Sequence, residues 1–361
     1  MKDQAQSRPR QAGFTLIEIL VTIAITGIVL AALIGAFNNQ SKVFQQQTDL
    51  TKSQAASRTA LFMMARDIRM AGYTGLPLGW EKVLATAGVY PVMSIKDGTT
   101  VLPGCSTYIT AIINDIKTIE DIGPTDAIAI VGNFARQTTS LKSDVHSTNN
   151  KISVNDVRAF MGEGYMKPAW AMIGTPGAAI KAELFPFTSA VAGSTPYEGT
   201  ISIDGNFSND YSASILTGYT ISGGVVPPAV VSPIFLRVYF VMPQDVGPGG
   251  NRQPALYSRN YYTPGKVTPN DYTEVIMAQG VVNLQLAYDL AAVGAGGDET
   301  IELDKGIVCD PCTTRGVRIT LFTWSDKFRD KKPLLREFST SVRVRNMGFN
   351  LLNCKIVPCT Y

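Results

Sequence analysis

The sequence predicts an α+β fold: a long N-terminal helix, membrane-spanning in its first half, packed on a large antiparallel β-rich globular head. Residues 14–37 are almost entirely apolar, and residues 38–71 contain neither proline nor glycine. Beyond residue 73, glycine and proline become frequent and separate short runs rich in β-branched and aromatic residues. We therefore expect four segments: a polar segment 1–13, an apolar helix 14–37, an exported amphipathic half of the same helix 38–72, and a globular head 73–361.

The apolar segment is long enough to cross a membrane. As a helix, residues 14–37 would span about 36 Å, against roughly 30 Å for a bilayer core. Lys2, Arg8 and Arg10 precede the segment, and basic flanks stay in the cytoplasm. We therefore expect a single-pass membrane protein with an exported head.

Glu18 is the only charged residue of this apolar segment. A cleaved secretory signal peptide would need a shorter apolar core followed by a small-residue cleavage site, and the segment fits neither. A plain signal anchor fits the length but gives no reason for the carboxylate, which costs about 2.5–3.5 kcal/mol at the bilayer centre and less near the interface. The charge therefore indicates a function that requires a partner.

The helix is predicted to continue to about residue 71. Leu61, Met64 and Ile68 share one face, which should pack on the head, whereas Asp67 can point outward. Gly72 is a suitable residue just beyond a helix C-terminus. The alternative is a separate membrane helix and a core helix with a bend between them.

Strands are expected in the apolar and aromatic runs of the head. These runs are 127–131, 152–154, 170–173, 234–242, 274–290, 317–324 and 338–344. Glycine clusters at 223–224, 247–250 and 294–297 predict turns or loops.

Composition and charge exclude several classes of function. Without residues 1–13, the formal charge falls from +3 to +1, with 29 basic against 28 acidic residues. The sequence therefore lacks the excess of positive charge that nucleic-acid binding requires. His146 is the only histidine and lies in a polar run that predicts an exposed loop. A lone histidine argues against histidine-rich metal sites and Ser-His or Cys-His catalysis. We expect no enzymatic activity and no cofactor.

The five cysteines all lie beyond the membrane segment. They are Cys105, Cys309, Cys312, Cys354 and Cys359. In an oxidising compartment they can form up to two disulfides. For the C-x-x-C pair Cys309 and Cys312, a structural disulfide or a cross-link to another cysteine is favoured over redox activity, because a strand-like segment follows rather than a helix. Cys354 and Cys359 could close a small loop, and the alternative is a zinc site that uses all four thiolates.

Four carboxylates cluster beside the last glycine run: Asp298, Glu299, Glu302 and Asp304. Oxygen ligands suit Ca²⁺, but the spacing of an EF-hand loop is absent. We interpret residues 298–304 as a solvated acidic turn, with calcium binding as the alternative.

The run Gly13-Phe14-Thr15-Leu16-Ile17-Glu18, followed by the apolar helix, resembles the prepilin processing motif of type IV pilins and type II secretion pseudopilins. The resemblance implies that residues 1–13 are a leader peptide that a prepilin peptidase removes by cutting after Gly13. Phe14 is then the methylated new N-terminus. Glu18 would pair with the terminal ammonium of a neighbouring subunit as helix 14–37 packs into a filament core.

The run 65–73 resembles the helix end of the PilW family of minor pilins. Further resemblances follow in that family's order, at 125–130, 237–241, 254–259, 279–289, 317–321 and 343–346. They imply a minor pilin that lies in the inner membrane as a precursor, contributes to initiation or assembly of a type IV pilus and then reaches the pilus or cell surface. The implied partners are other minor and major pilins, the inner-membrane assembly platform and the lipid bilayer. A type II secretion pseudopilin and a pilus-tip adhesin are the alternatives.

Overall fold

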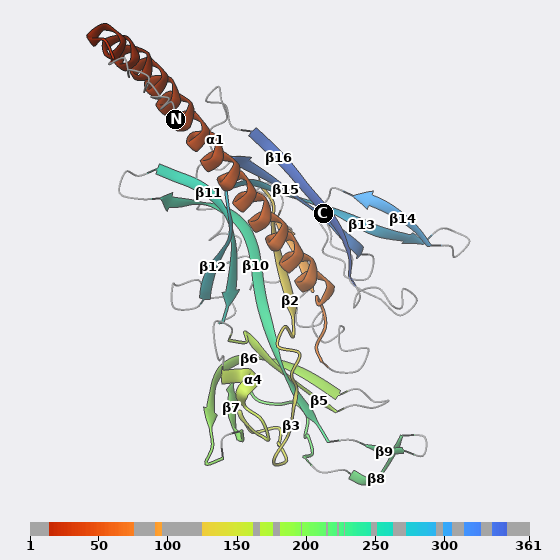
Figure 1. Cartoon of the computed structure of the whole chain (residues 1–361). Coiled ribbons are helices and arrows are strands. Elements are labelled where there is room, and N and C mark those ends of the chain that lie inside the picture. Colours follow the sequence, from red (N-terminus) through yellow and green to blue (C-terminus); the bar gives the residue numbers. More distant parts are fainter. Residues whose placement is uncertain are drawn as a thin grey trace, which may run out of the picture.

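The computed structural model confirms the α+β fold class: a long N-terminal helix lies along an antiparallel β head and projects beyond it (Figure 1). The structure describes residues 14–75, 91–95, 125–161, 167–175, 181–195, 197–213, 216–221, 224–226, 228–246, 251–262, 272–293, 299–304, 314–325 and 334–344.

Helix α1 (Leu16–Arg69) is one uninterrupted α-helix of 54 residues, so the alternative of two helices with a bend is wrong. Thr15 caps its N-terminus with extended backbone. At the C-terminus Gly72 adopts a positive φ of 71°, and its N–H donates to the Val131 carbonyl at 2.9 Å. This glycine ends the helix and turns the chain onto the sheet.

Two antiparallel sheets and one hairpin make up the described head. The first, ten-stranded sheet has the order β1-β2-β10-β5-β6-β7-β4, with β11 and β3 also paired to β10 and β12 to β11; the second has the order β14-β13-β15-β16. The strands of the first sheet are β1 (Val92–Ile95), β2 (Ala127–Gly132), β3 (Thr139–Ser140), β4 (Lys151–Val154), β5 (Trp170–Thr175), β6 (Lys181–Ala192), β7 (Gly199–Ile203), β10 (Val230–Val246), β11 (Asn251–Tyr261) and β12 (Tyr272–Gln279). The others are β13 (Val281–Val293), β14 (Glu299–Asp304), β15 (Thr314–Ser325), β16 (Leu334–Arg343) and the hairpin β8 (Leu216–Ile221) and β9 (Gly224–Val226).

Strand β10 runs through the length of the first sheet. Its first residues pair with β5, its middle with β2, and its second half with β11. The chain between β2 and β10, residues 133–229, carries β3 to β9 and the short helix α4 (Arg158–Met161). We call it the distal lobe, because it lies at the end of the head opposite the projecting helix (Figure 1).

Among the described residues, buried apolar side chains form three clusters. The first lies beneath α1 and joins Leu61, Met64 and Ile68 to both sheets. The second packs the other face of β10 and β2, and the third fills the distal lobe. The second half of α1 is therefore part of the head's core.

The predicted strand runs coincide with observed strands, except that the run 338–344 extends one residue beyond β16 and one run is divided. The run 274–290 is cut at Gly280, which has a φ of 75°, into β12 of the first sheet and β13 of the second. The acidic turn predicted for residues 298–304 is wrong over 299–304, which form β14 paired with β13. Its glycine-rich neighbour 294–297 and the run 247–250 lie outside the described residues.

Candidate functional site: the N-terminal helix

The first half of α1 is apolar, and it is not covered by the described part of the head. All side chains from Phe14 to Gln47 are exposed, a stretch of roughly 50 Å at 1.5 Å per residue. By length and composition this end of the helix could cross a membrane. Apolar surface on this scale is not stable in water, so it requires lipid or other helices around it.

Glu18 lies in the first turn of this helix and closes a capping box with Thr15. The Thr15 N–H and hydroxyl each donate to Glu18 Oε2 at 3.0 Å, and the Glu18 N–H donates to Thr15 Oγ1 at 3.3 Å. Among the described residues, no hydrogen bond reaches Oε1. The carboxylate is thus held at the helix N-terminus, where the macrodipole favours an anion, and keeps one oxygen for a further donor.

Phe14, the predicted new N-terminus, precedes the capping residue and is 84% exposed. Phe14 therefore lies four residues before Glu18, at the projecting end of α1. Gly13, the predicted cleavage residue, lies outside the described residues.

At its other end α1 is fixed to the head through Asp67, whose side chain is fully buried. Arg237 Nη1 and the Tyr239 hydroxyl, both on β10, donate to Asp67 Oδ2, the latter at 2.6 Å. Arg237 Nε also donates to Asn260 Oδ1 on β11 at 2.7 Å. The network ties the helix to two strands of the first sheet.

The surroundings of Tyr239 and Arg237 keep both groups protonated, so that both can donate. Burial, reinforced by the Asp67 carboxylate, raises the pKa of Tyr239 and keeps its hydroxyl protonated as a donor. Burial alone would lower the pKa of Arg237, but the neighbouring Tyr239 and Asp67 outweigh it and raise that pKa. The expectation that Asp67 points outward is wrong. Its spacing of three residues from Met64 was the signal that places it beside the buried face.

The remaining predicted site residues give no described site. The cysteines, Cys105, Cys309, Cys312, Cys354 and Cys359, lie outside the described residues, so the disulfide, redox and zinc hypotheses stay predictions. His146 lies on an exposed segment with Nδ1 3.7 Å from Asp210 Oδ1, as its polar run predicted. Within the described part of the chain, no group of three or more His, Cys, Asp or Glu side chains could hold a metal ion.

Comparison with known proteins gives one match to a protein family, and this match lies at the N-terminal end of the chain. Residues 8–34 match the family described as the prokaryotic N-terminal methylation motif. The chain is pilin-like at its N-terminus. No curated protein and no solved structure matches it.

The motif of a pilin-like protein carries further implications. It implies processing by a prepilin peptidase and association with pilins, and together with the apolar helix it indicates a membrane-anchored protein. Pilin-like proteins of this kind are structural rather than enzymatic. The motif is common to type IV pilins and type II secretion pseudopilins, so it leaves the finer assignment to other evidence.

Proposed function

We propose that this chain is a minor pilin of a type IV pilus, of the PilW type, that contributes to initiation or assembly of the filament. The observation that carries the proposal is the methylation motif over residues 8–34, joined to a helix whose side chains are exposed from Phe14 to Gln47. A subunit built in this way is stable in the bilayer before assembly and among neighbouring helices afterwards. The ordered resemblances to the PilW family extend the proposal from the N-terminus to the head.

Processing creates the charge that assembly uses. Hydrolysis of the Gly13–Phe14 peptide bond leaves a carboxylate on Gly13 and an ammonium on Phe14, and methylation keeps the positive charge on that nitrogen. The ammonium lies close to the apolar phase, where an isolated charge is costly. Glu18 of a neighbouring subunit supplies the counter-ion, because a hydrogen-bonded pair is far less costly than either charge alone.

The anchoring of α1 to the head supports an assembly role. The shared core and the buried Asp67–Arg237 pair fix the direction of the helix relative to the head. Packing of the helix among its neighbours then determines where the head lies on the filament. We propose no catalytic role for the chain.

The test is mass spectrometry of the N-terminal peptide of the full chain, made in cells that contain its prepilin peptidase. We expect N-methylated Phe14 as the first residue. A Gly13→Glu variant, which blocks the cleavage position, should retain Met1 and serve as the control. An intact Met1 on wild-type chains in a piliated strain would refute the proposal.

A binding role at the pilus tip is the second candidate, and the distal lobe favours it. The lobe lies at the end of the head farthest from the membrane-spanning half of α1 (Figure 1). There Arg158 covers the ring of Tyr197 at 4.2 Å, with Val191 also exposed. Attachment assays on cells whose pili carry Tyr197→Ala would separate the roles: unchanged piliation with lost attachment supports binding. A pseudopilin would instead be required for secretion and not for piliation.

A further inference from the structure

The half of α1 that packs on the head also has an apolar side facing away from the head. Phe44, Thr48, Thr51, Ala55 and Phe62 project within about 40° of one direction at 3.6 residues per turn, opposite the buried side chains. We call these five residues the outer face. Phe44 and Phe62 are 69% and 66% exposed, and they lie five turns, or about 27 Å, apart along the helix.

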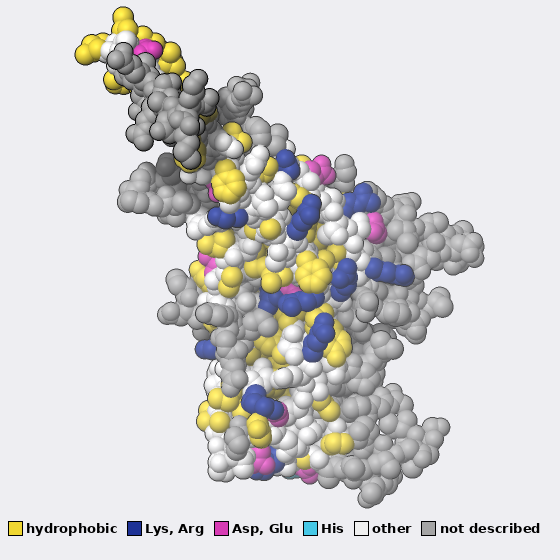
Figure 2. All heavy atoms as spheres, in the orientation of Figure 1, with side chains coloured by type: hydrophobic (Ala, Val, Ile, Leu, Met, Phe, Trp, Pro, Cys, Tyr) yellow, Lys and Arg dark blue, Asp and Glu magenta, His cyan; other side chains and the backbone are white. Residues whose placement is uncertain are grey.

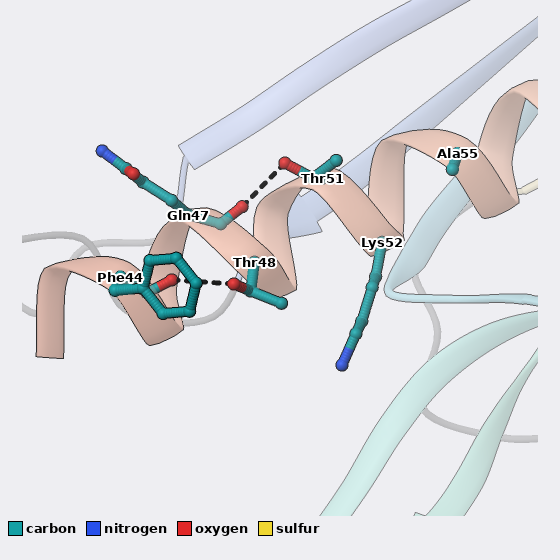
Figure 3. Close-up of a pocket in the computed structure, with 6 residues that line it drawn as sticks. All are labelled: Phe44, Gln47, Thr48, Thr51, Lys52 and Ala55. Carbon is teal, nitrogen blue, oxygen red and sulfur yellow. Dashed lines mark hydrogen bonds between the residues drawn. The ribbon is translucent and has the colours of Figure 1, made fainter. Parts of the chain in front are cut away.

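A shallow groove of about 430 Å³ lies on this face, lined by Phe44, Gln47, Thr48, Thr51, Lys52 and Ala55 (Figure 3). Its floor is apolar because the threonine hydroxyls are used inside the helix. Thr48 Oγ1 donates to the Phe44 carbonyl at 2.9 Å, and Thr51 Oγ1 to the Gln47 carbonyl at 2.8 Å. The small floor residues allow another backbone to approach closely, beside the larger Phe44.

The borders of the outer face are basic. Lys52 and Arg58 are exposed, and each is three residues from Ala55, so they project roughly 60° to either side of it. Residues 38–69 contain five Lys or Arg against Asp49 and Asp67, and Asp67 is buried. Figure 2 shows Lys and Arg side chains among the apolar side chains over the packed part of α1.

The strands that pack against α1 do not neutralise this charge. In β12, Glu274 pairs with Arg259 at 2.6 Å. In β16, Glu337 is outnumbered by Arg336 and Arg343, and β15 carries Arg315 and Arg318 but no Asp or Glu. A ligand of the outer face therefore meets an apolar groove with positive borders.

We propose that the outer face binds an α-helix of a different pilin-like subunit, whose apolar contact stripe is bordered by Asp or Glu. This inference rests on the proposed function and names a partner for the same helix. Phe37 lies two turns before Phe44 on the same side and is exposed, so the outer face continues the apolar surface of the first half of α1. A helix packed on that half can thus extend onto the groove.

The charges select a different subunit over a second copy. In a parallel pair of identical helices, Lys52 and Arg58 would approach their own counterparts, and like charges at close range destabilise the pair. Acidic borders on the partner would instead form cross-helix ion pairs, as at the edges of coiled coils.

The test is site-specific photo-crosslinking of the full-length chain in native membranes, with p-benzoylphenylalanine in place of Thr51. We expect a crosslink to a helix of another protein that carries a prepilin motif and acidic residues beside the crosslinked peptide, identified by mass spectrometry. The same probe in place of Lys151, exposed on β4 of the distal lobe, is the matched control and should not give this product.

Charge reversal tests the recognition itself. Lys52→Glu combined with Arg58→Glu should lower the crosslink yield about threefold to tenfold, on the scale of two exposed ion pairs. Lys151→Glu should leave the yield unchanged. A crosslink to a second copy, to lipid alone or to nothing overturns the inference, as does a yield that the reversal does not change.

The N-terminal peptide from the same sample separates this inference from the proposed function. Methylated Phe14 without the crosslink would contradict only the assignment of the partner helix. A chain that retains Met1 would instead contradict the minor-pilin proposal.

Discussion

At the residue scale, Glu18 combines two roles that different substitutions can separate. Its carboxylate caps the helix through Thr15, and its charge is the proposed counter-ion for a neighbouring Phe14 ammonium. Glutamine at the same position preserves the capping box, because an amide oxygen also accepts from the N-cap residue. Only the charge is then lost.

We therefore predict that Glu18→Gln is inserted and processed normally but is not incorporated into pili. Immunoblots of sheared pili and of membranes would measure the two pools. Asp49→Asn, which removes an exposed charge from the same helix, should be incorporated as the wild type is. Normal incorporation of Glu18→Gln would show that the charge is unnecessary.

Asp67 is the second residue for which the structure makes a direct prediction. Asp67→Ala leaves the buried Arg237 guanidinium and the Tyr239 hydroxyl without their acceptor, and breaking a buried ion pair from one side costs about 3–5 kcal/mol. Thermal unfolding of the full-length protein in detergent, followed by circular dichroism, should show a large decrease in midpoint. Asp49→Ala should shift stability by less than about 0.5 kcal/mol; equal effects would contradict the assigned network.

At the element scale, Gly280 allows the chain to pass from β12 in the first sheet to β13 in the second. Its φ of 75° lies in the left-handed region, and a Cβ there would approach the Trp324 carbonyl oxygen to 2.9 Å. Its own N–H donates to Pro254 and its carbonyl accepts from Trp324. The turn is therefore bonded to both sheets.

Gly280→Ala should destabilise the protein by about 1–3 kcal/mol, from backbone strain with a tight contact added. Urea unfolding of the full-length protein would measure the change. Gly280→Asn introduces the same Cβ but tolerates positive φ better, so it should be less harmful. If both variants were as stable as the wild type, the turn would not constrain the sheets.

The sequence predicted those elements whose signal is local. The apolar run from Phe14, the absence of Pro and Gly through residue 71 and the apolar strand runs each reflect a periodicity that one element contains. Gly280 lay in a continuous β-rich run, and only pairing to two different sheets shows that it divides the run. The acidic composition of residues 299–304 led to the prediction of a turn. These residues form β14 because they pair with β13, and composition does not encode that tertiary contact.

The candidate site likewise contains residues that a local sequence pattern indicates and residues that only the fold brings together. Gly13, Phe14 and Glu18 could be proposed from sequence because their signal is a short contiguous motif. Arg237 and Tyr239 are far from Asp67 in the chain, and only the fold brings them together. The outer face was also missed, since its meaning depends on which side of α1 the head covers.

At the scale of the whole molecule, the packed half of α1 and the β head form one folding unit. Leu61, Met64 and Ile68 are buried against both sheets, and each large apolar side chain contributes about 1.5–3 kcal/mol on burial. Asp67 adds the buried carboxylate that pairs with the Arg237 guanidinium. Together these terms approach the whole free energy of unfolding of a typical domain, about 5–15 kcal/mol.

A fragment that starts at residue 73 should therefore not fold, although that boundary separates the helix from the β-rich sequence. Residues 42–361, which lose the apolar span but keep the packed half from Thr48 onward, should be soluble and unfold cooperatively. Circular dichroism melts and hydrogen exchange of the two fragments make the comparison, and the strands beneath α1 should be protected only in the longer one. Native-like protection of β10 and β15 in fragment 73–361 would mean that the head folds without the helix. In that case α1 would merely lie on a finished head, and its direction, on which the assembly proposal depends, would not be fixed by folding.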